Sequence, residues 1–221
     1  MIWHIYNMGY VIRTPKQCFG IDLYHRRAAE LAPYLDFILV THSHGDHVWK
    51  PLFEAMEAAG KPVVTNFREN KWKFSEPRRF RFGEAAVRTL QADHNRKLLK
   101  FVNIYEIDCG PSAGDCVILH TGDACDPAQF EVEKPVDIFI PHIRVGMNIE
   151  NAAKNYVKPG YILMSHVLEL GHAVGNARWT YENGLGDCRK VLYCENVWMP
   201  VWGEKFIWNG DGRSLAPAAL K

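Results

Sequence analysis

The sequence predicts a layered α/β or α+β architecture, in which β-sheets pack against helices. Three observations support this: short apolar runs bounded by turn residues recur along the chain, helix-like segments lie between them, and 48% of the 221 residues are hydrophobic. Strands interspersed with helices in one chain are typical of layered folds. Because no stretch has the composition of a linker, a repeat or a low-complexity region, we expect residues 1–221 to form a single domain.

The expected strands are runs of apolar or β-branched residues that end at turn residues. They are residues 9–14, 18–24, 37–40, 63–65, 79–82, 86–91, 100–107, 117–120, 136–140 and 161–164, with an aromatic strand pair over 196–208. Residues 37–40, Phe-Ile-Leu-Val, are unbroken, which is typical of a strand buried on both faces. Residues 79–82 alternate Arg and Phe, which indicates one face in contact with water.

Three segments favour helices. Residues 25–34 are rich in Ala, Leu, Arg and Glu, which have high helix propensity. Residues 51–60 begin with proline and end with glycine, the residue types that suit the two ends of a helix. Residues 149–157 form the third expected helix.

Composition and charge exclude several classes of protein. The apolar content is too high and the formal net charge of +1 too low for a disordered chain. No apolar run reaches the roughly 18–20 residues that a membrane span needs, so we expect no membrane partner. Residues 1–7 lack a basic segment followed by an apolar one, so we expect no signal peptide and a cytoplasmic location. The six cysteines form no C-x-x-C pair, which indicates reduced and mostly buried thiols, Cys125 included.

Residues 41–47, with the sequence THSHGDH, follow the buried run and carry the most informative pattern. An H-x-H-x-D-H pattern would arise by chance in about one such chain per thousand, which argues against a merely histidine-rich surface loop. Residues two apart in an extended segment point the same way, so His42 and His44 can present two imidazoles to one metal ion. A turn at Gly45 lets Asp46 and His47 offer an oxygen and a nitrogen to a second ion. Such polar groups at the end of a buried strand need a compensating partner, which a dication supplies.

This pattern resembles the signature loop of the metallo-β-lactamase-fold hydrolase superfamily, and further motifs of that family follow in order. His94 follows a strand-like run, Asp123 lies in a Thr-Gly-Asp turn, and His166 ends a late strand, with His172 as its alternative. The resemblance implies a four-layer αββα sandwich, in which helices flank two β-sheets and metal ions lie at one edge. It implies that one metal is held by His42, His44 and His94, a second by Asp46, His47 and His166, and that both are bridged by Asp123. Residues 9–22 also resemble the family's opening strand pair, which ends near an aspartate.

The donor types and the resemblance together favour two Zn²⁺ ions, with Mn²⁺ or Fe as alternatives. Di-iron relatives typically have Glu where this chain has His44. Two dications that share an oxygen lower the pKa of bound water toward ~7, so we expect a metal-bound hydroxide to attack a carbonyl carbon or a phosphorus atom. Asp46 and Asp123 would orient the metal pair as catalytic ligands. No G-x-S-x-G segment supports a serine nucleophile. The predicted activity is therefore that of a dinuclear metal-dependent hydrolase.

The substrate class follows from the resemblance alone. A chain little longer than the core domain is similar to the single-domain ascorbate-6-phosphate-lactonase-like branch, which implies a small-molecule ester, lactone or phosphoester. His142 and Arg144 stand where that branch tends to have small residues. Arg96, Lys97 and Arg144 are candidates to hold a substrate anion and His142 to line the site. Solvated charges and a structural histidine are the alternatives.

Two other functions stay open at this stage. Residues 67–82 interleave six Lys and Arg residues with aromatic ones, as in proteins that bind nucleic acid, which gives a nuclease or phosphodiesterase as an alternative. The small net charge argues against nucleic acid as a partner. A non-catalytic protein whose metals serve only its structure is the other alternative, although closed structural zinc sites rarely need a bridging carboxylate. The sequence does not determine the oligomeric state.

Overall fold

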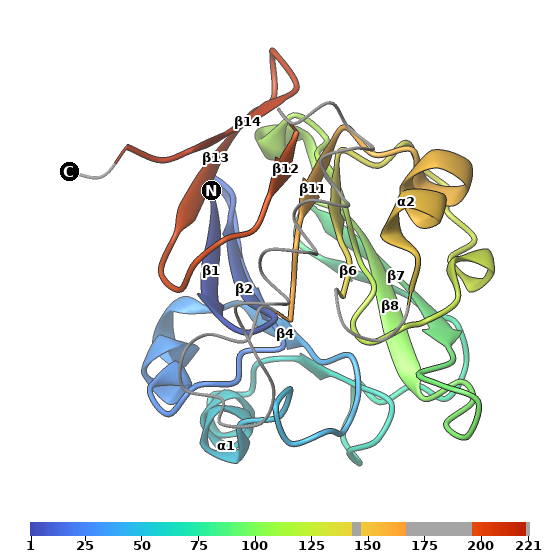
Figure 1. Ribbon diagram of the computed structural model, residues 1–221. Coiled ribbons are helices and arrows are strands. Elements are labelled where there is room, and N and C mark those ends of the chain that lie inside the picture. Colours follow the sequence, from blue (N-terminus) through green and yellow to red (C-terminus); the bar gives the residue numbers. More distant parts are fainter. Residues whose placement is uncertain (143–146, 167–195, 220–221) are drawn as a thin grey trace.

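A computed structural model describes residues 1–142, 147–166 and 196–219, which form two β-sheets stacked face to face (Figure 1). The strands of the first sheet are β1 (Ile2–Tyr6), β2 (Gly9–Arg13), β3 (Cys18–Ile21), β4 (Phe37–Leu39), β5 (Val63–Val64), β13 (Lys205–Asn209) and β14 (Ser214–Pro217). Those of the second are β6 (Arg79–Phe82), β7 (Ala85–Ala92), β8 (Val102–Asp108), β9 (Val117–His120), β10 (Ile138–Ile140), β11 (Tyr161–Leu163) and β12 (Val197–Trp198). The spatial orders are β14-β13-β1-β2-β3-β4-β5 and β12-β11-β10-β9-β8-β7-β6.

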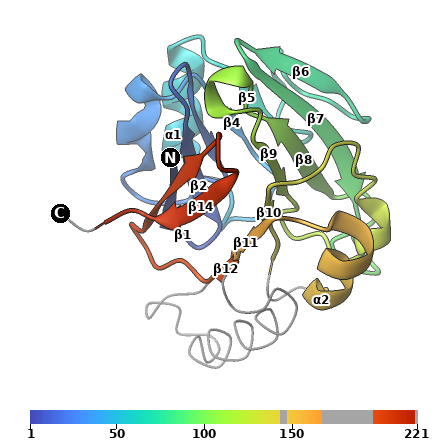
Figure 2. The same cartoon turned by 90° about the horizontal axis from the view of Figure 1, so that it is seen from above.

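Helices cover the outer face of each sheet. They are the 3₁₀ helix η1 (Ala28–Tyr34) and α1 (Lys50–Ala58) on the first sheet, and α2 (Ile149–Asn151), which continues as the π-helical η4 (Ala152–Val157), on the second. Two short 3₁₀ turns, η2 (Pro111–Ala113) and η3 (Pro127–Gln129), lie between β8 and β9 and between β9 and β10. Seen from above, α1 and α2 lie on opposite sides of the two sheets (Figure 2). None of the helices in the described residues is long and apolar enough to cross a membrane.

The direction of alternate side chains explains this layering. In β4, Phe37 and Leu39 pack in the core between the sheets, whereas Ile38 packs on the other face with residues of η1 and α1. In β10, Ile138 likewise faces the space between the sheets, and Phe139 faces α2 and η4. Successive side chains of a strand point to opposite faces, so these unbroken apolar runs fill two core layers at once. The result is the four-layer αββα sandwich that the sequence analysis predicted.

The strand directions bring several strand ends to one edge of the molecule. Because β8 is antiparallel to both β7 and β9, and because β9, β10 and β11 are parallel, strands β7, β9, β10 and β11 all end at the same edge of the second sheet. Polar side chains that follow these strands can therefore gather at that edge, although they are far apart in the sequence.

Several predicted elements differ in detail from the observed ones. The pattern did not predict β1 or β14. Residues 25–34 form the shorter 3₁₀ helix η1, because Pro33 lies inside it and cannot donate the hydrogen bond of an α-helix. The expectation that the strands within residues 196–208 pair with each other is wrong. Strand β12 adds to β11 in the second sheet, and β13 lies between β1 and β14 in the first, because the segment between them crosses from one sheet to the other.

Candidate metal centre

The segment that follows β4 carries the first part of the site. Asp22 fixes the first residue of this segment, because its carboxylate accepts hydrogen bonds from the backbone N–H of Thr41 (2.8 Å) and from the Thr41 hydroxyl (2.6 Å). A turn then closes over Gly45, with the N–H of His47 donating to the carbonyl oxygen of His44 (3.0 Å). The chain reverses within this turn, so the side chains before and after it face one region.

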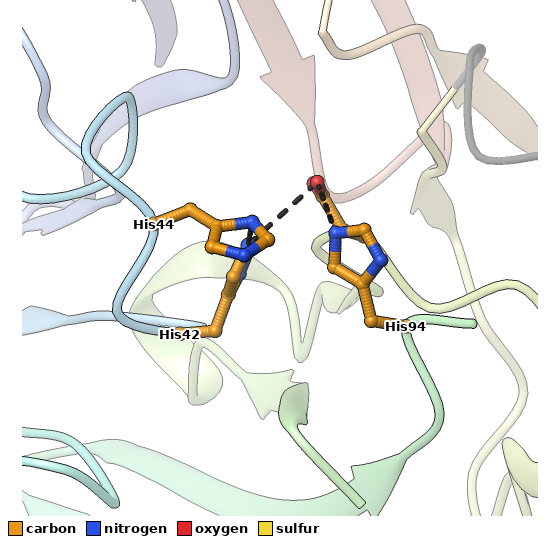
Figure 3. A group of neighbouring side chains, drawn as sticks. His42, His44 and His94 are labelled. Carbon is orange, nitrogen blue, oxygen red and sulfur yellow. Dashed lines mark hydrogen bonds and ion pairs between the residues drawn. The ribbon is translucent and has the colours of Figure 1, made fainter. Parts of the chain in front are cut away.

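One group of side chains comprises His42, His44, His94 and Asp123, and each offers one ligand atom within 4.8 Å of the others (Figure 3). The Nε2 atom of His42 lies 3.0 Å from Nδ1 of His44 and 3.6 Å from Oδ2 of Asp123. The Nε2 atom of His94 lies 3.3 Å from the same carboxylate oxygen. We call these four residues the first donor group.

A second donor group comprises Asp46, His47 and His166, whose ligand atoms also lie within 4.8 Å of one another. The Nε2 atom of His166 lies 3.0 Å from Oδ2 of Asp46, and Nε2 of His47 lies 4.0 Å from Oδ1 of the same carboxylate. His166 has a positive φ of 59°, a left-handed backbone conformation that is uncommon outside glycine.

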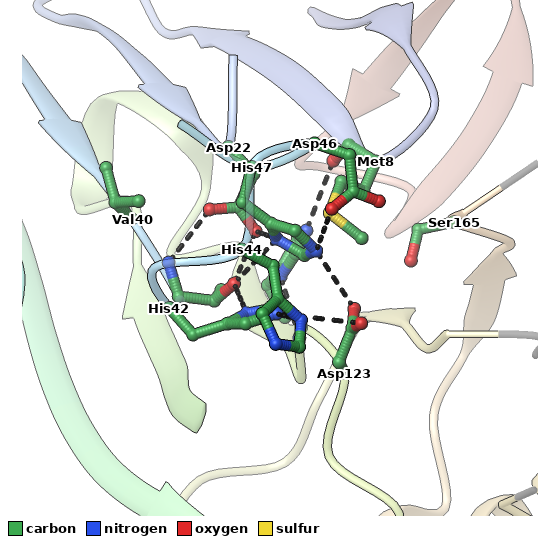
Figure 4. A network of polar contacts seen from close by, with 12 residues as sticks. Met8, Asp22, Val40, His42, His44, Asp46, His47, Asp123 and Ser165 are labelled. Atoms are coloured by element: carbon green, nitrogen blue, oxygen red, sulfur yellow. Dashed lines mark hydrogen bonds and ion pairs between the residues drawn. The ribbon is translucent and has the colours of Figure 1, made fainter. Parts of the chain in front are cut away.

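The carboxylate of Asp123, a member of the first donor group, also faces the second, and Figure 4 shows it beside both His42 and His47. Its Oδ2 faces His42 and His94, and its Oδ1 lies 3.2 Å from Nε2 of His47. The fold therefore brings together all seven residues that the sequence analysis proposed as ligands, with Asp123 in the intermediate position. The turn that presents Asp123 requires Gly122, because its φ is +49° and an added Cβ would lie 2.7 Å from Cβ of Thr41.

Asp22 is a part of the site that the sequence analysis did not assign. It is 1% exposed, and its Oδ2 accepts a hydrogen bond from Nδ1 of His47 (3.0 Å). This contact keeps a proton on Nδ1, so Nε2, the ring nitrogen that faces Asp123, is the one left to bind a metal once it loses its proton; carboxylates orient metal-binding imidazoles in this way in other proteins. The signal for Asp22 was its position at the end of the opening strand pair. Its role follows from its contacts with Thr41 and His47, which only the folded structure shows.

Phe101 is the other residue that the sequence analysis missed. Its ring lies beside the first donor group, with its centroid 5.5 Å from that of His42 and 5.2 Å from that of His44. It gives the first donor group an apolar neighbour. An isolated Phe next to a strand carries no signal that distinguishes this position from an ordinary core position.

Burial and neighbouring charges set the protonation of the site. Burial lowers the pKa of His42 to about 3, so this imidazole is neutral. Burial also opposes a charge on His47, but Asp22 and Asp123 overcome it and raise the pKa of His47 to about 10. The pKa values of Asp46 and Asp123 are lowered because the neighbouring imidazoles outweigh the effect of burial. The centre thus places ionised carboxylates beside the neutral imidazole of His42, an arrangement that favours bound cations.

Unpartnered polar atoms test whether a metal fits this site. Within the described residues, Nε2 of His47 and Oδ1 of Asp123 are buried and lie 3.2 Å apart without a well-formed hydrogen bond, and Nδ1 of His166 is buried and makes none. A buried polar atom without a partner costs about 1–3 kcal/mol. A cation held between Nε2 of His47 and Oδ1 of Asp123 would satisfy both atoms. The donors are imidazole nitrogens and carboxylate oxygens, which suit a divalent metal.

The remaining predicted residues lie in different surroundings. His142 is buried and lies next to Asp123, with 3.3 Å between its Nε2 and Oδ1 of the carboxylate. Arg96 and Lys97 are exposed in the turn that follows His94. Cys125 is half-buried, and burial raises the pKa of its thiol, so it is not activated as a nucleophile. Arg144 and His172 lie outside the described residues.

Comparisons with known proteins were made by sequence and by structure. No protein-family model and no curated protein matches the sequence. Among solved structures, the metallo-β-lactamase fold protein YhfI from Bacillus subtilis is 16% identical, with a TM-score of 0.67 over 90% of each chain. A possible metal-dependent hydrolase from Veillonella parvula is 14% identical, with a TM-score of 0.63 over 92% of this chain and 97% of that one. CmlA, a diiron β-hydroxylase from Streptomyces venezuelae, is 12% identical, with a TM-score of 0.56 over 75% of this chain and 44% of its own.

Proposed function

Because the chain has the metallo-β-lactamase fold, we propose that it is a metal-dependent hydrolase with a dinuclear centre. The observation that carries the proposal is the position of Asp123. Its two carboxylate oxygens face different donor groups, which is the geometry that a bridging ligand needs. Because fold alone is a weak basis for assigning an activity, the proposal rests on the side chains at this sheet edge.

The first donor group would hold one metal ion and the second donor group another. Divalent ions bound there would polarise a carbonyl or phosphoryl oxygen and lower the pKa of a water ligand. The chain's own residues prepare this chemistry. Asp22 fixes the ring of His47 through its Nδ1, and Asp46 and Asp123 supply negative charge as ligands rather than as free bases. Phe101 places an apolar ring beside the first donor group.

We propose Zn²⁺ as the metal, with Mn²⁺ or Fe as alternatives. The two donor groups contain five imidazoles and two carboxylates and no thiolate, a set that suits zinc. The fold does not decide between metals, since CmlA, a diiron enzyme, shares it. Zinc is favoured by the donor types, and above all by His44 in the first donor group, where di-iron relatives typically have Glu.

For the substrate we propose a small molecule with an ester, lactone or phosphoester bond. Arg96 and Lys97 are exposed and lie two and three residues after His94, where they would contact an anionic group of a substrate at the first donor group. Removal of their charge would then raise KM for phosphorylated substrates and leave KM for neutral ones unchanged.

Nucleic acid is a less favoured substrate because much of the basic segment 67–82 is already neutralised. Arg68 forms a bidentate pair with Glu57 (2.8 and 2.7 Å), Arg79 pairs with Glu133, and Lys73 pairs with Glu69. Cations that are paired with glutamates offer less charge to phosphates.

The test of the proposed function is hydrolysis of bis(p-nitrophenyl) phosphate and a panel of small lactones by the zinc-loaded protein. Wild-type activity that falls at least a hundredfold in His44→Ala supports the proposal. His25→Ala removes a histidine outside both donor groups and serves as the matched control, with activity close to wild type expected. Turnover that persists in His44→Ala, or that survives removal of the metal by a chelator, would refute it.

A further inference from the structure

We propose that His142 is an additional ligand of the second metal ion, so that the two halves of the centre are unequal. This inference rests on the proposed function, because it assumes that the second donor group holds a metal. The sequence favoured a structural role for this histidine, or a contact with substrate. Its position in the fold points instead to the metal.

The parallel pairing of β10 and β11 continues past their ends and places His142 beside His166, a proposed ligand. His142 pairs in parallel with Ser165, whose N–H and hydroxyl both donate to the carbonyl oxygen of Pro141 (2.9 and 2.8 Å). This register sets the rings of His142 and His166 side by side, with 3.9 Å between their centroids. The backbone thus fixes the position of His142 as firmly as that of His166.

The imidazole of His142 points at the carboxylate between the donor groups. Its Nε2 lies 3.3 Å from Oδ1 of Asp123, the same oxygen that lies 3.2 Å from Nε2 of His47. Ligand atoms of Asp123, His142 and His166 all lie within 4.8 Å of one another. The side chain of His142 is 3% exposed, so its ring is enclosed in this position.

Another buried histidine shows that burial alone does not produce this geometry. His120 is also fully buried, but its Nδ1 accepts a hydrogen bond from the N–H of Gly122 (3.1 Å) and its Nε2 lies 3.4 Å from the carbonyl oxygen of Met8. Both ring nitrogens of His120 thus have backbone partners, and neither belongs to a donor group. In His142 the Nε2 atom faces Asp123.

The consequence is an asymmetric centre. With His142, the second metal has five candidate protein donors: Asp46, His47, Asp123, His142 and His166. The first metal has four: His42, His44, His94 and Asp123. A metal with fewer protein donors keeps open positions for water and substrate. We therefore expect the first metal to be the exchangeable one and the second to be held more tightly.

The experiment is a titration of the metal-free protein with Co²⁺, followed by calorimetry and by the visible spectrum of the bound ion. The variants are His142→Phe, which fills the ring volume without a donor, and His44→Ala, which removes a ligand of the first metal only. We expect wild type to bind two ions, and a chelator should remove the ion at the first donor group before the ion at the second. In His142→Phe the second site weakens by about tenfold or more and its spectrum changes. In His44→Ala, metal binding at the first donor group weakens instead.

Two outcomes would overturn the inference in different ways. If His142→Phe binds both ions with affinities and spectra equal to those of wild type, His142 is not a ligand and the proposed function stands. If wild type binds no metal, the proposed function fails and the inference fails with it. Should His142→Phe not fold, ¹⁵N NMR of the wild-type histidines replaces it. The Nε2 resonance of His142 must shift on addition of Zn²⁺, and an unshifted resonance refutes its role as a ligand.

Discussion

Replacement of Asp22 by asparagine tests whether the Asp22 carboxylate orients the imidazole of His47 for metal binding. In wild type, Oδ1 of Asp22 accepts from the backbone N–H of Thr41, while Oδ2 accepts from the Thr41 hydroxyl and from Nδ1 of His47. An asparagine has only one acceptor oxygen. If that oxygen stays on the N–H of Thr41, the new NH₂ group faces Nδ1 of His47 and makes it an acceptor. The proton of His47 then moves to Nε2, the atom that would bind the metal.

The size of the effect follows from these contacts. Loss of one charge-assisted hydrogen bond in a buried site costs about 1.5–3 kcal/mol, and changes to such partners of metal ligands lower metal affinity by about 10–100-fold. We therefore expect Asp22→Asn to weaken the second metal site by that factor and to leave the first within about threefold of wild type.

Calorimetric titration with Zn²⁺ measures both sites in one experiment. Asp36→Asn is a matched control, because Asp36 also accepts a backbone hydrogen bond, from the N–H of Cys18 (2.7 Å), but contacts neither donor group. Equal affinities of Asp22→Asn and wild type for both ions would refute the argument that Asp22 sets the tautomer of His47.

Three further predictions concern the turn, the pH and the scaffold. Gly122→Ala places a Cβ 2.7 Å from Cβ of Thr41 at a positive φ, so we expect it to lower the free energy of unfolding by about 1–3 kcal/mol in urea denaturation, and an unchanged midpoint would contradict this. The pKa of His47 is about 10 in the metal-free protein, so metal uptake must release its proton and affinity must rise with pH toward 10, by about tenfold per unit; titrations that show no pH dependence between 6 and 9 would exclude this competition. Glu106→Ala removes the buried partner of Arg88 (3.0 Å) but leaves its ion pair with Glu133 (2.9 Å), so we expect about 1–3 kcal/mol of destabilisation with normal metal content, and loss of metal would show that the pair also supports the site.

From the residues alone, the sequence grouped the donors that lie close together in the chain, whereas His94, Asp123 and His166 were implied by the family resemblance. His42, His44, Asp46 and His47 lie within six residues of one another, so the geometry of an extended segment and a turn was enough to group them. The layered α/β or α+β class followed in the same way from apolar runs such as residues 37–40, whereas the four-layer sandwich was implied by the family resemblance.

The parts that the sequence did not predict depend on partners remote in the chain. Asp22 acquires its role from Thr41 and His47, which lie 19 and 25 residues further along. The position of His142 follows from the register of β10 and β11, which local pattern does not determine. For the same reason β12 and β13 were expected to pair with each other, whereas the fold places them in different sheets.

Metal content is the most direct test of the dinuclear centre. Elemental mass spectrometry of the wild-type protein, after reconstitution with Zn²⁺ and removal of the excess, should give about two zinc ions per chain. Asp123→Ala removes the carboxylate between the donor groups and should retain less than half of that metal. A wild-type protein that takes up no zinc, or an Asp123→Ala variant that retains both ions, would contradict the account.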